Sequence, residues 1–205
     1  MDISNCRNIG IMGGSFDPIH IGHLAMAQEA CEYFGLDKIL FIPTGKSPHK
    51  DRKMTSPEKR LEWVKTAVKD NPLFEYSDYE SRKKTPSYTL ETIEYLQNIY
   101  SEVKFYYILG EDSLLEIETW YRYEELLSKC VFLAARRSPS WEDALNKKIQ
   151  ELISRGFDVR EIPFRFLEIS STEIRGKFKA GQNPRYYLLQ NIYKDILEEK
   201  IYNEE

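Results

Sequence analysis

The strongest structural signal in this chain lies in residues 8–24, which read NIGIMGGSFDPIHIGHL. Residues 8–12 form a short apolar run that ends in two glycines, a pattern typical of a buried strand. Residues 22–34 follow with helical spacing of their apolar side chains, and Gly35 is a typical helix stop. The segment therefore predicts a strand, a tight turn and a helix, which together open a parallel α/β sheet.

The rest of the chain repeats this alternation of apolar runs with amphipathic stretches. Further strands are expected at residues 38–42, 73–76, 103–109, 130–135 and 164–169. Further helices are expected after the cap Ser56 and over residues 90–100, 123–128 and 140–153, with two more at the C-terminal end. The buried stripe of the helix after Ser56 is expected at Leu61, Val64, Ala67 and Val68. This order predicts a doubly wound, mostly parallel sheet followed by C-terminal helices.

Length and composition limit the class of protein. The 205 residues suit one domain, expected over residues 1–205 with a helical C-terminal part from about residue 170. The 29 basic and 33 acidic residues give a net charge of −4, which argues against nucleic acid or an anionic membrane as partner. The 3 cysteines form no CxxC pair, which favours a reducing compartment. No targeting segment or long apolar run is visible, so a cytoplasmic protein is expected.

The turn after the first strand has the chemistry of a phosphate site. Gly13 and Gly14 let a ligand approach the backbone closely, and the start of the next helix offers unpaired N–H groups. His20 and His23 can donate hydrogen bonds to phosphate oxygens. A single histidine here would most simply be a surface residue, but two that flank a helix-opening glycine favour a nucleotide site. No Glu or Cys nearby completes a zinc ligand set, and the HxGH spacing differs from the HExxH signature of zinc enzymes.

A second motif lies in residues 169–175, which read ISSTEIR. Ser171 and Thr172 are good helix caps whose hydroxyls can instead face a phosphate. Arg175 lies one helical turn further along and can make a charge-assisted contact with a triphosphate oxygen. Alone, the segment is equally well a capped helix with a surface arginine. Together with the first motif, it favours a second phosphate-binding element.

The two motifs carry a family resemblance. GGSFDPIHIGHL resembles the GGxFDPxHxGH signature of the HxGH nucleotidyltransferases, and ISSTEIR resembles the ISSTxIR motif of the same family. The resemblance implies a Rossmann-like nucleotidyltransferase fold and transfer of a nucleoside monophosphate from a triphosphate. It also implies catalytic roles for His20, His23 and Arg175. The ATP-binding residues that it implies further include Gly13, Gly14, Ser15, Phe16, Ser171 and Thr172.

The remaining chain resembles the bacterial nicotinate-nucleotide adenylyltransferases almost end to end. The segments that carry this resemblance are residues 42–50, 85–93, 108–113 with Trp120, and 132–137. The resemblance implies transfer of AMP from ATP to nicotinate mononucleotide, which gives nicotinate adenine dinucleotide and pyrophosphate in NAD biosynthesis. Gly110 and Asp112 would then contact the adenosine. The mononucleotide-binding residues implied are Lys46, His49, Lys50, Tyr88, Thr89, Trp120 and Arg137.

Some positions depart from the family pattern or admit a simpler interpretation. Ser138-Pro139 follows Arg137, which leaves open whether Arg136 or Arg137 binds the mononucleotide phosphate. Asp195 stands where the family often has a tyrosine, a change expected to affect packing more than chemistry. The basic loop at residues 46–53 also fits an ordinary solvated loop, and Trp120 also fits plain core packing.

The expected metal is Mg²⁺ carried by ATP, with no dedicated carboxylate cage. Two alternatives to the implied function stay open: a related adenylyltransferase that acts on nicotinamide mononucleotide, and a nucleotide-binding regulator without turnover. The sequence also leaves open whether the protein forms a homo-oligomer. The intact histidine and ISSTEIR motifs argue against the regulator.

Overall fold

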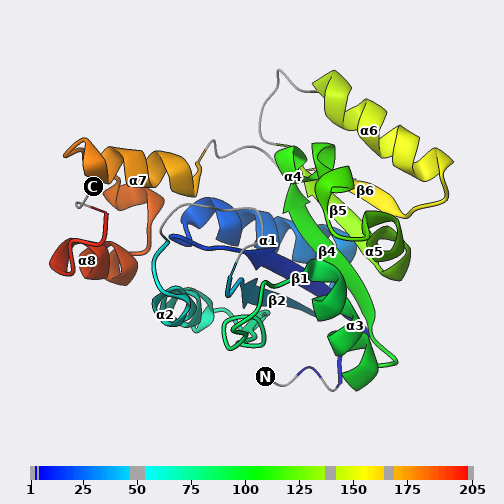
Figure 1. The fold of residues 1–205 in the computed structure, drawn as a ribbon, viewed down its shortest axis with the longest axis horizontal. Helices are drawn as coiled ribbons and strands as arrows, with labels where there is room; N and C mark the ends of the chain where they lie inside the picture. Colours follow the sequence, from blue (N-terminus) through cyan, green and yellow to red (C-terminus); the bar gives the residue numbers. More distant parts are fainter. Residues whose placement is uncertain (1–2, 4, 47–53, 137–141, 164–168, 203–205) are drawn as a thin grey trace.

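The computed structural model describes residues 3, 5–46, 54–136, 142–163 and 169–202. Within these residues the chain forms a six-stranded sheet of parallel neighbours in the order β3-β2-β1-β4-β5-β6 (Figure 1). The strands are β1 Asn8–Gly14, β2 Lys38–Pro43, β3 Phe74–Tyr76, β4 Lys104–Gly110, β5 Val131–Ala135 and β6 Val159–Ile162. The helices are α1 Ile21–Phe34, α2 Pro57–Val68, α3 Thr89–Ile99, α4 Glu111–Leu115, α5 Tyr123–Lys129, α6 Glu142–Ser154, α7 Ser171–Lys179 and α8 Gln190–Glu198. Short 3₁₀ turns lie at Ile117–Thr119 and Arg185–Tyr187.

The sheet reverses its strand order at β1. This strand pairs with β2 on one side and with β4 on the other. In open α/β sheets, the connections on the two sides of such a reversal diverge and leave a crevice at the carboxyl ends of the strands, where ligands bind. The doubly wound fold expected from the sequence is confirmed, and every pairing in the described sheet is parallel.

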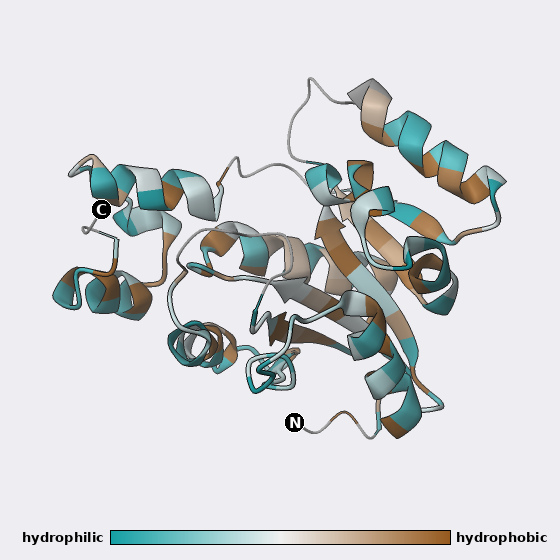
Figure 2. Ribbon diagram, in the orientation of Figure 1, coloured by the Kyte–Doolittle hydropathy of each residue, from teal (hydrophilic) through white to brown (hydrophobic). Residues whose placement is uncertain are grey.

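Each face of the sheet has its own apolar layer, because successive side chains of a strand point to opposite faces. Ile39 and Phe41 of β2 belong to a cluster with residues of α1, α2, α7 and α8. Leu40 and Ile42 belong to a second cluster with residues of α3, α4, α5 and α6. Figure 2 shows the hydrophobic colours gathered in the central strands, whereas the helices carry both colours. The fold is thus a sheet between two helical layers.

Local signals placed most elements correctly. Gly35 ends α1 in the left-handed conformation with φ 59°, and the Ser56 side chain accepts a hydrogen bond from the Lys59 N–H at the start of α2. The strand expected at residues 164–169 is wrong at its described end, because Ile169 lies outside any strand, and residues 164–168 lie outside the described residues. The last described strand is β6, which forms the edge of the sheet and has two charged residues between two buried apolar ones.

The buried stripe of α2 also differs from the expected one. Val64 and Val68 are buried as expected, but the other buried side chains of α2 are Arg60 and Trp63. The Trp63 indole N–H donates to Asp195 Oδ2 of α8 at 2.6 Å, and Lys59 Nζ lies 2.9 Å from the same carboxylate. Asp195 therefore joins α8 to α2 through polar contacts.

Replacing Asp195 with asparagine should weaken this junction in a pH-dependent way. Burial alone would raise the pKa of Asp195, but hydrogen bonds from Lys59 and Trp63 outweigh it and lower the pKa. A depressed pKa stabilises the folded state above the unfolded pKa of about 4, and the benefit is lost as pH falls through the folded value. We expect Asp195→Asn to cost less than about 1 kcal/mol at pH 7, since the pair is partly exposed.

Urea unfolding at several pH values between about 3 and 7 tests this expectation. The free energy of unfolding of the wild type should fall more steeply with decreasing pH than that of Asp195→Asn. Equal slopes for the two proteins would contradict the role assigned to this carboxylate.

Candidate active site

A cavity of about 450 Å³ lies at the carboxyl ends of β1 and β4, at the reversal of strand order. Its walls come from the β1–α1 turn, the end of β4 with α4, and the N-terminal ends of α3 and α7. Residues singled out from the sequence that line it are Gly13, Gly14, Ser15, Phe16, His20, His23, Tyr88, Thr89, Gly110, Asp112, Trp120, Ser171, Thr172 and Arg175. The structure thus brings both sequence motifs to one place.

The two glycines of the first turn differ in what surrounds them. A Cβ atom added at Gly13 would overlap the Tyr107 hydroxyl oxygen of neighbouring β4, so this position has no room for a side chain. Gly14 has ordinary contact distances, and its carbonyl oxygen accepts a hydrogen bond from the Thr44 N–H at 2.9 Å. Phe16 follows with a positive φ of 47° and is buried. Gly13 is therefore required by the packing of Tyr107, and the approach of a ligand to this diglycine stays a prediction.

The two histidines form a stacked pair at the start of α1. Their ring centroids lie 3.7 Å apart, and the backbone N–H of His20 donates a hydrogen bond to His23 Nδ1 at 3.3 Å. In a neutral imidazole whose Nδ1 accepts, Nε2 carries the proton, so His23 retains Nε2–H as a donor. The edge of Phe16 also packs against the His23 ring, with centroids 5.1 Å apart. The ring of His23 is therefore oriented by its neighbours.

The second motif reaches across to the first. Ser170, not Ser171 or Thr172, accepts the capping hydrogen bond of α7, from the Glu173 N–H at 3.1 Å. Ser171 Oγ donates to the Pro18 carbonyl oxygen at 2.9 Å across a sequence separation of 153 residues. Neither Ser171 nor Thr172 is the N-cap residue, and both residues line the cavity.

Arg175 joins the same two motifs through its guanidinium. Its Nη1 donates to the Asp17 carbonyl oxygen at 2.7 Å, and its Nη2 donates to Thr172 Oγ1 at 3.0 Å. The Asp17 side chain is fully buried and accepts from the Tyr202 hydroxyl at 2.9 Å. Burial, with the Asp17 charge nearby, raises the pKa of Tyr202, so this phenol stays a donor. The turn is thus held from α7 and from the segment after α8.

Aromatic side chains form another part of the cavity lining. Tyr88 and Thr89 lie at the start of α3, and Tyr88 packs against Tyr121 with ring centroids 4.6 Å apart. Trp120 lies after the 3₁₀ turn, half-buried, with its ring edge-on to Tyr107 at 5.9 Å. Trp120 therefore packs against the core and also lines the cavity, so the two interpretations of this residue hold together.

The residues that the resemblance implies for binding adenosine and the mononucleotide phosphate differ in whether they line the cavity. Gly110 ends β4, and Asp112 is exposed in the first turn of α4, and both line the cavity. Lys46 is exposed and is not among the lining residues, although its carbonyl oxygen accepts from the Ser87 N–H at 3.0 Å. Arg136 pairs with Glu161 of β6 at 2.8 Å and does not line the cavity. Three further predicted residues, His49, Lys50 and Arg137, lie outside the described residues.

Known proteins match this chain over a stretch that includes both motifs. The cytidylyltransferase-like family model matches residues 11–177, which include both motifs. A probable nicotinate-nucleotide adenylyltransferase of Caldicellulosiruptor saccharolyticus is 39% identical over 197 residues, covering 96% of this chain and 99% of that relative. One of the same name from Desulfitobacterium hafniense is 41% identical over 192 residues, covering 91% of each chain. This chain belongs to the nicotinate-nucleotide adenylyltransferase family. The family resemblance seen in the sequence is confirmed.

Solved structures support the fold of this nicotinate-nucleotide adenylyltransferase family member. The nicotinic acid mononucleotide adenylyltransferase of Plasmodium falciparum, complexed with NaAD, has a TM-score of 0.78 at 21% identity. The comparison covers 96% of this chain and 98% of the other. At this identity the likeness establishes the fold, and the expected Rossmann-like nucleotidyltransferase fold is confirmed.

Several lining residues of this adenylyltransferase family member were not singled out from the sequence. Glu80 and Tyr107 are buried, and Glu80 accepts from Thr92 Oγ1 at 2.7 Å. Burial raises the pKa of Glu80 despite this hydrogen bond. Neither residue has a local signal, because their places depend on contacts between distant segments. Ser87 and Tyr121, by contrast, directly adjoin Tyr88 and Trp120 and could have been found by extending those motifs.

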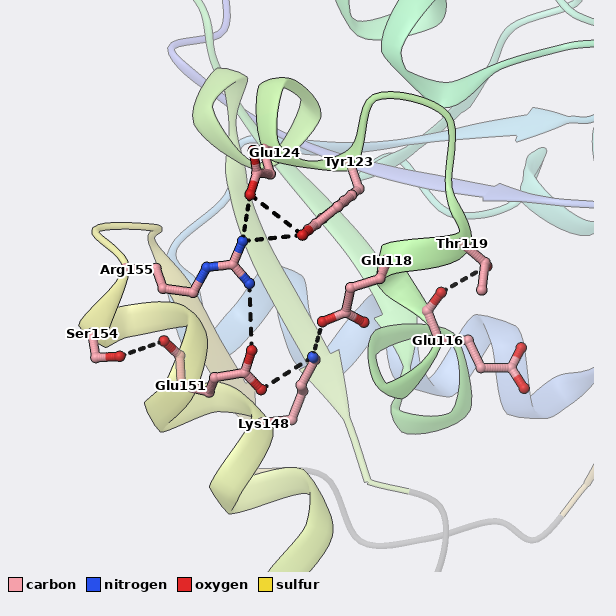
Figure 3. A network of polar contacts seen from close by, with 9 residues as sticks. All are labelled: Glu116, Glu118, Thr119, Tyr123, Glu124, Lys148, Glu151, Ser154 and Arg155. Atoms are coloured by element: carbon pink, nitrogen blue, oxygen red, sulfur yellow. Dashed lines mark hydrogen bonds and ion pairs between the residues drawn. The ribbon is translucent and has the colours of Figure 1, made fainter.

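A polar network supports the aromatic wall from the side of α6 (Figure 3). Lys148 contacts Glu118 of the 3₁₀ turn and lies 3.2 Å from Glu151. Arg155 bridges Glu151 and Glu124 of α5, the latter at 2.6 Å. Burial alone would raise the pKa of Glu118, but the Lys148 ammonium outweighs it and lowers the pKa. An ion pair therefore connects the 3₁₀ turn that precedes Trp120 to α6.

Replacing Lys148 with methionine should lower the Tm by roughly 2–4 °C, because a network of this kind contributes about 1 kcal/mol in a chain of this size. The Lys148 side chain is only 11% exposed, so methionine keeps the packing of the aliphatic stem. Lys147→Met, at the exposed neighbouring position, is the matched control and should leave the Tm unchanged. Scanning calorimetry at low and at high salt checks both proteins, and equal shifts for the two would contradict the network's role.

No described helix has the length and apolar character that a membrane crossing requires. Among the described residues, no group of three or more His, Cys, Asp or Glu side chains gathers so as to hold a metal ion.

Proposed function

We propose that this protein transfers the adenylyl group of ATP to nicotinate mononucleotide, giving nicotinate adenine dinucleotide and pyrophosphate. One observation carries the proposal: a single cavity joins a histidine, serine and arginine wall suited to phosphates with a tyrosine and tryptophan wall suited to a pyridine ring. Relatives that carry this enzyme name, at 39% and 41% identity over most of the chain, support it.

The reaction joins two phosphates. A phosphate oxygen of the mononucleotide attacks the α-phosphorus of ATP and forms a new P–O bond. The bond from that phosphorus to the bridging oxygen of the β-phosphate breaks, and pyrophosphate leaves with the electron pair. Because a phosphate monoester is already anionic near neutral pH, the step requires no general base. Catalysis then rests on positioning and electrostatic stabilisation.

The residues of the cavity divide between these tasks. His20 and His23, at the N-terminal end of α1, would donate to the α- and β-phosphates, with the His23 donor at Nε2. Ser171, Thr172 and Arg175 would hold the departing β- and γ-phosphates. The hydrogen bonds of Ser171 and Arg175 to the turn at residues 17–18 hold the two proposed phosphate-binding elements at a fixed separation.

Mg²⁺ is proposed to enter with ATP, held mainly by phosphate oxygens and water, as this ion prefers. It would neutralise negative charge on the triphosphate during the transfer. Glu116 is a carboxylate in the cavity lining that could accept hydrogen bonds from its bound waters, whereas Asp112 would contact the adenosine.

The start of α3 favours the acid over the amide of the pyridine ring. Tyr88 is the N-cap residue and Thr89 the first residue of α3, and both line the cavity. A helix N-terminus attracts a carboxylate through its unpaired N–H groups and its partial positive charge. A neutral carboxamide gains less there, so nicotinate mononucleotide is preferred to nicotinamide mononucleotide.

We also infer that residues 1–205 act as one domain. The cavity takes residues from β1 near the N-terminal end and from α7 near the C-terminal end. Cutting the chain between them would divide the phosphate-binding wall.

Pyrophosphate release tests the proposal directly. The purified protein is given ATP and Mg²⁺ with nicotinate mononucleotide, nicotinamide mononucleotide or phosphopantetheine in turn. We expect release with nicotinate mononucleotide, at a kcat/KM at least about tenfold above that for the amide, a difference of about 1.4 kcal/mol. Higher kcat/KM with another acceptor would overturn the proposed substrate. No release with any of them, together with intact ATP binding, would identify a nucleotide-binding regulator.

A further inference from the structure

The segment after α8 contains a buried tyrosine that reaches the β1–α1 turn. Tyr202 is 6% exposed, and its hydroxyl donates to Asp17 Oδ1 at 2.9 Å across a sequence separation of 185 residues. The Asp17 side chain is fully buried, and neither residue lines the cavity. Because a buried carboxylate requires hydrogen-bond donors, this contact holds the side chain of residue 17 from a distant part of the chain.

The backbone of the same aspartate holds Arg175 of α7. The Asp17 carbonyl oxygen accepts from Arg175 Nη1 at 2.7 Å, and Arg175 Nη2 donates to Thr172 Oγ1 at 3.0 Å. Because a guanidinium is planar and its N–H groups have a fixed fork geometry, two such hydrogen bonds fix the orientation of its plane. Arg175 and Thr172 both line the cavity. The orientation of this arginine in the cavity therefore depends on where the carbonyl group of residue 17 lies.

The ring of Tyr202 packs against the helix that carries this arginine. Its centroid lies 5.9 Å from that of Phe178, which is three residues beyond Arg175 in α7. The Trp63 ring of α2 lies 6.4 Å from it as well, and both neighbours are buried. Close packing of this kind restricts the movement of a ring. Tyr202 therefore touches both sides of the Arg175–Asp17 hydrogen bond, α7 through its ring and residue 17 through its hydroxyl.

We propose that Tyr202 is a positioning residue that, through Asp17, fixes the orientation of Arg175 toward the phosphates of ATP. This inference rests on the proposed function. Without the hydroxyl, residue 17 loses one of the contacts that place it, and the guanidinium bound to its carbonyl oxygen shifts with it. A misplacement of about 1 Å costs about 10² in rate, so the smaller shift expected from one lost hydrogen bond should cost about tenfold.

Tyr202→Phe removes the hydroxyl alone and keeps the ring that packs against Phe178. We expect kcat per folded molecule, measured by pyrophosphate release, to fall about tenfold. The KM for nicotinate mononucleotide should stay within about threefold of the wild type, because Tyr88 and Trp120 of the proposed ring site are untouched. Unchanged kcat in the folded variant, with only a lower Tm, would overturn the proposal in favour of a purely structural role. A larger rise in this KM would overturn it as well.

Tyr193→Phe is the matched control. Tyr193 of α8 also packs against Phe178, with ring centroids 6.1 Å apart, and it does not line the cavity. The control therefore removes a hydroxyl from the same aromatic layer, and its kcat should equal that of the wild type. A loss comparable to that of Tyr202→Phe would overturn the proposal, because it would show that any change in this layer lowers turnover.

A double-mutant cycle separates positioning from general destabilisation. Arg175→Lys keeps the positive charge but lacks the planar fork that the Asp17 carbonyl orients. Since the fork is then absent, adding Tyr202→Phe to this chain should lower kcat by less than about threefold, against about tenfold in the wild-type chain. Independent effects multiply, so an equal loss in both chains would overturn the proposal.

Asp17→Ala breaks the same hydrogen bond from its other end. It also removes the buried carboxylate, whereas Tyr202→Phe leaves that carboxylate without this donor. Asp17→Ala therefore decides the question should Tyr202→Phe not fold, as judged by circular dichroism. We expect the same loss of kcat, about tenfold, which again shrinks below about threefold in the Arg175→Lys chain. Unchanged kcat in folded Asp17→Ala would overturn the proposal.

The wild-type assay separates this inference from the proposed function. A wild type that releases no pyrophosphate contradicts the function, whereas an active wild type with fully active variants contradicts only the role of Tyr202.

Discussion

Replacing His23 with alanine should lower kcat by about 10²–10³, the usual cost of losing one transition-state donor. His23 accepts at Nδ1 from the His20 N–H, so its Nε2–H is the donor available to the phosphates. The fold should persist, because His23 is only half-buried and the helix has its own apolar face. Steady-state pyrophosphate release, corrected for folded protein, measures the loss.

His23→Gln provides the comparison, because its side-chain amide retains an N–H donor of similar reach. We expect its kcat to lie between those of the wild type and His23→Ala. A folded His23→Ala protein with near-normal turnover would show that this ring is not a transition-state donor.

Replacing Gly13 with alanine should lower kcat/KM by about 10² and the free energy of unfolding by about 1–3 kcal/mol. The new methyl group would overlap the Tyr107 hydroxyl oxygen, so the buried Tyr107 ring or the paired strands β1 and β4 must shift. The position of Gly13 immediately before the phosphate-binding turn explains why activity falls together with stability.

Tyr107→Phe in the same chain should restore part of both quantities. With the hydroxyl removed, the nearest ring atom to the new methyl group is Tyr107 Cζ at 3.3 Å, a contact that small shifts relieve. Double-mutant analysis should give a favourable coupling of about 0.5–3 kcal/mol between the two positions. Gly176→Ala is the control, because nothing lies within 4 Å of the added atom in α7, and alanine there should raise stability by up to about 1 kcal/mol. Additive effects at Gly13 and Tyr107 would contradict the steric explanation.

Signals confined to one segment of the sequence predicted much of this fold. The diglycine after residues 8–12, the proline next to Ser56 and the left-handed Gly35 each act on their own backbone, and the structure has the expected element at each. β6 was missed because an edge strand tolerates charged residues, so Arg160 and Glu161 hide its apolar pattern.

The sequence predicted the two motifs of the candidate site, but it did not predict the buried residues that hold them in place. Residues of both sequence motifs, with Tyr88, Thr89 and Trp120, line one cavity, and their roles toward the substrates stay predictions. Arg60 and Glu80 could not be foreseen, because a buried charge is tolerated only through partners that are distant in the sequence. Helical periodicity placed Leu61 in the core of α2 and gave no reason to place an arginine there.

The hydrogen bond from Tyr202 to Asp17 has a consequence for how the protein is made. The chain leaves the ribosome from its N-terminal end, so the turn at Asp17 emerges long before α7 and Tyr202. A nascent chain still lacking these segments has only one of the two phosphate-binding walls, and its buried aspartate has yet to receive this donor. A nucleotide that contacts both motifs can therefore stabilise the fold only after α7 has been synthesised.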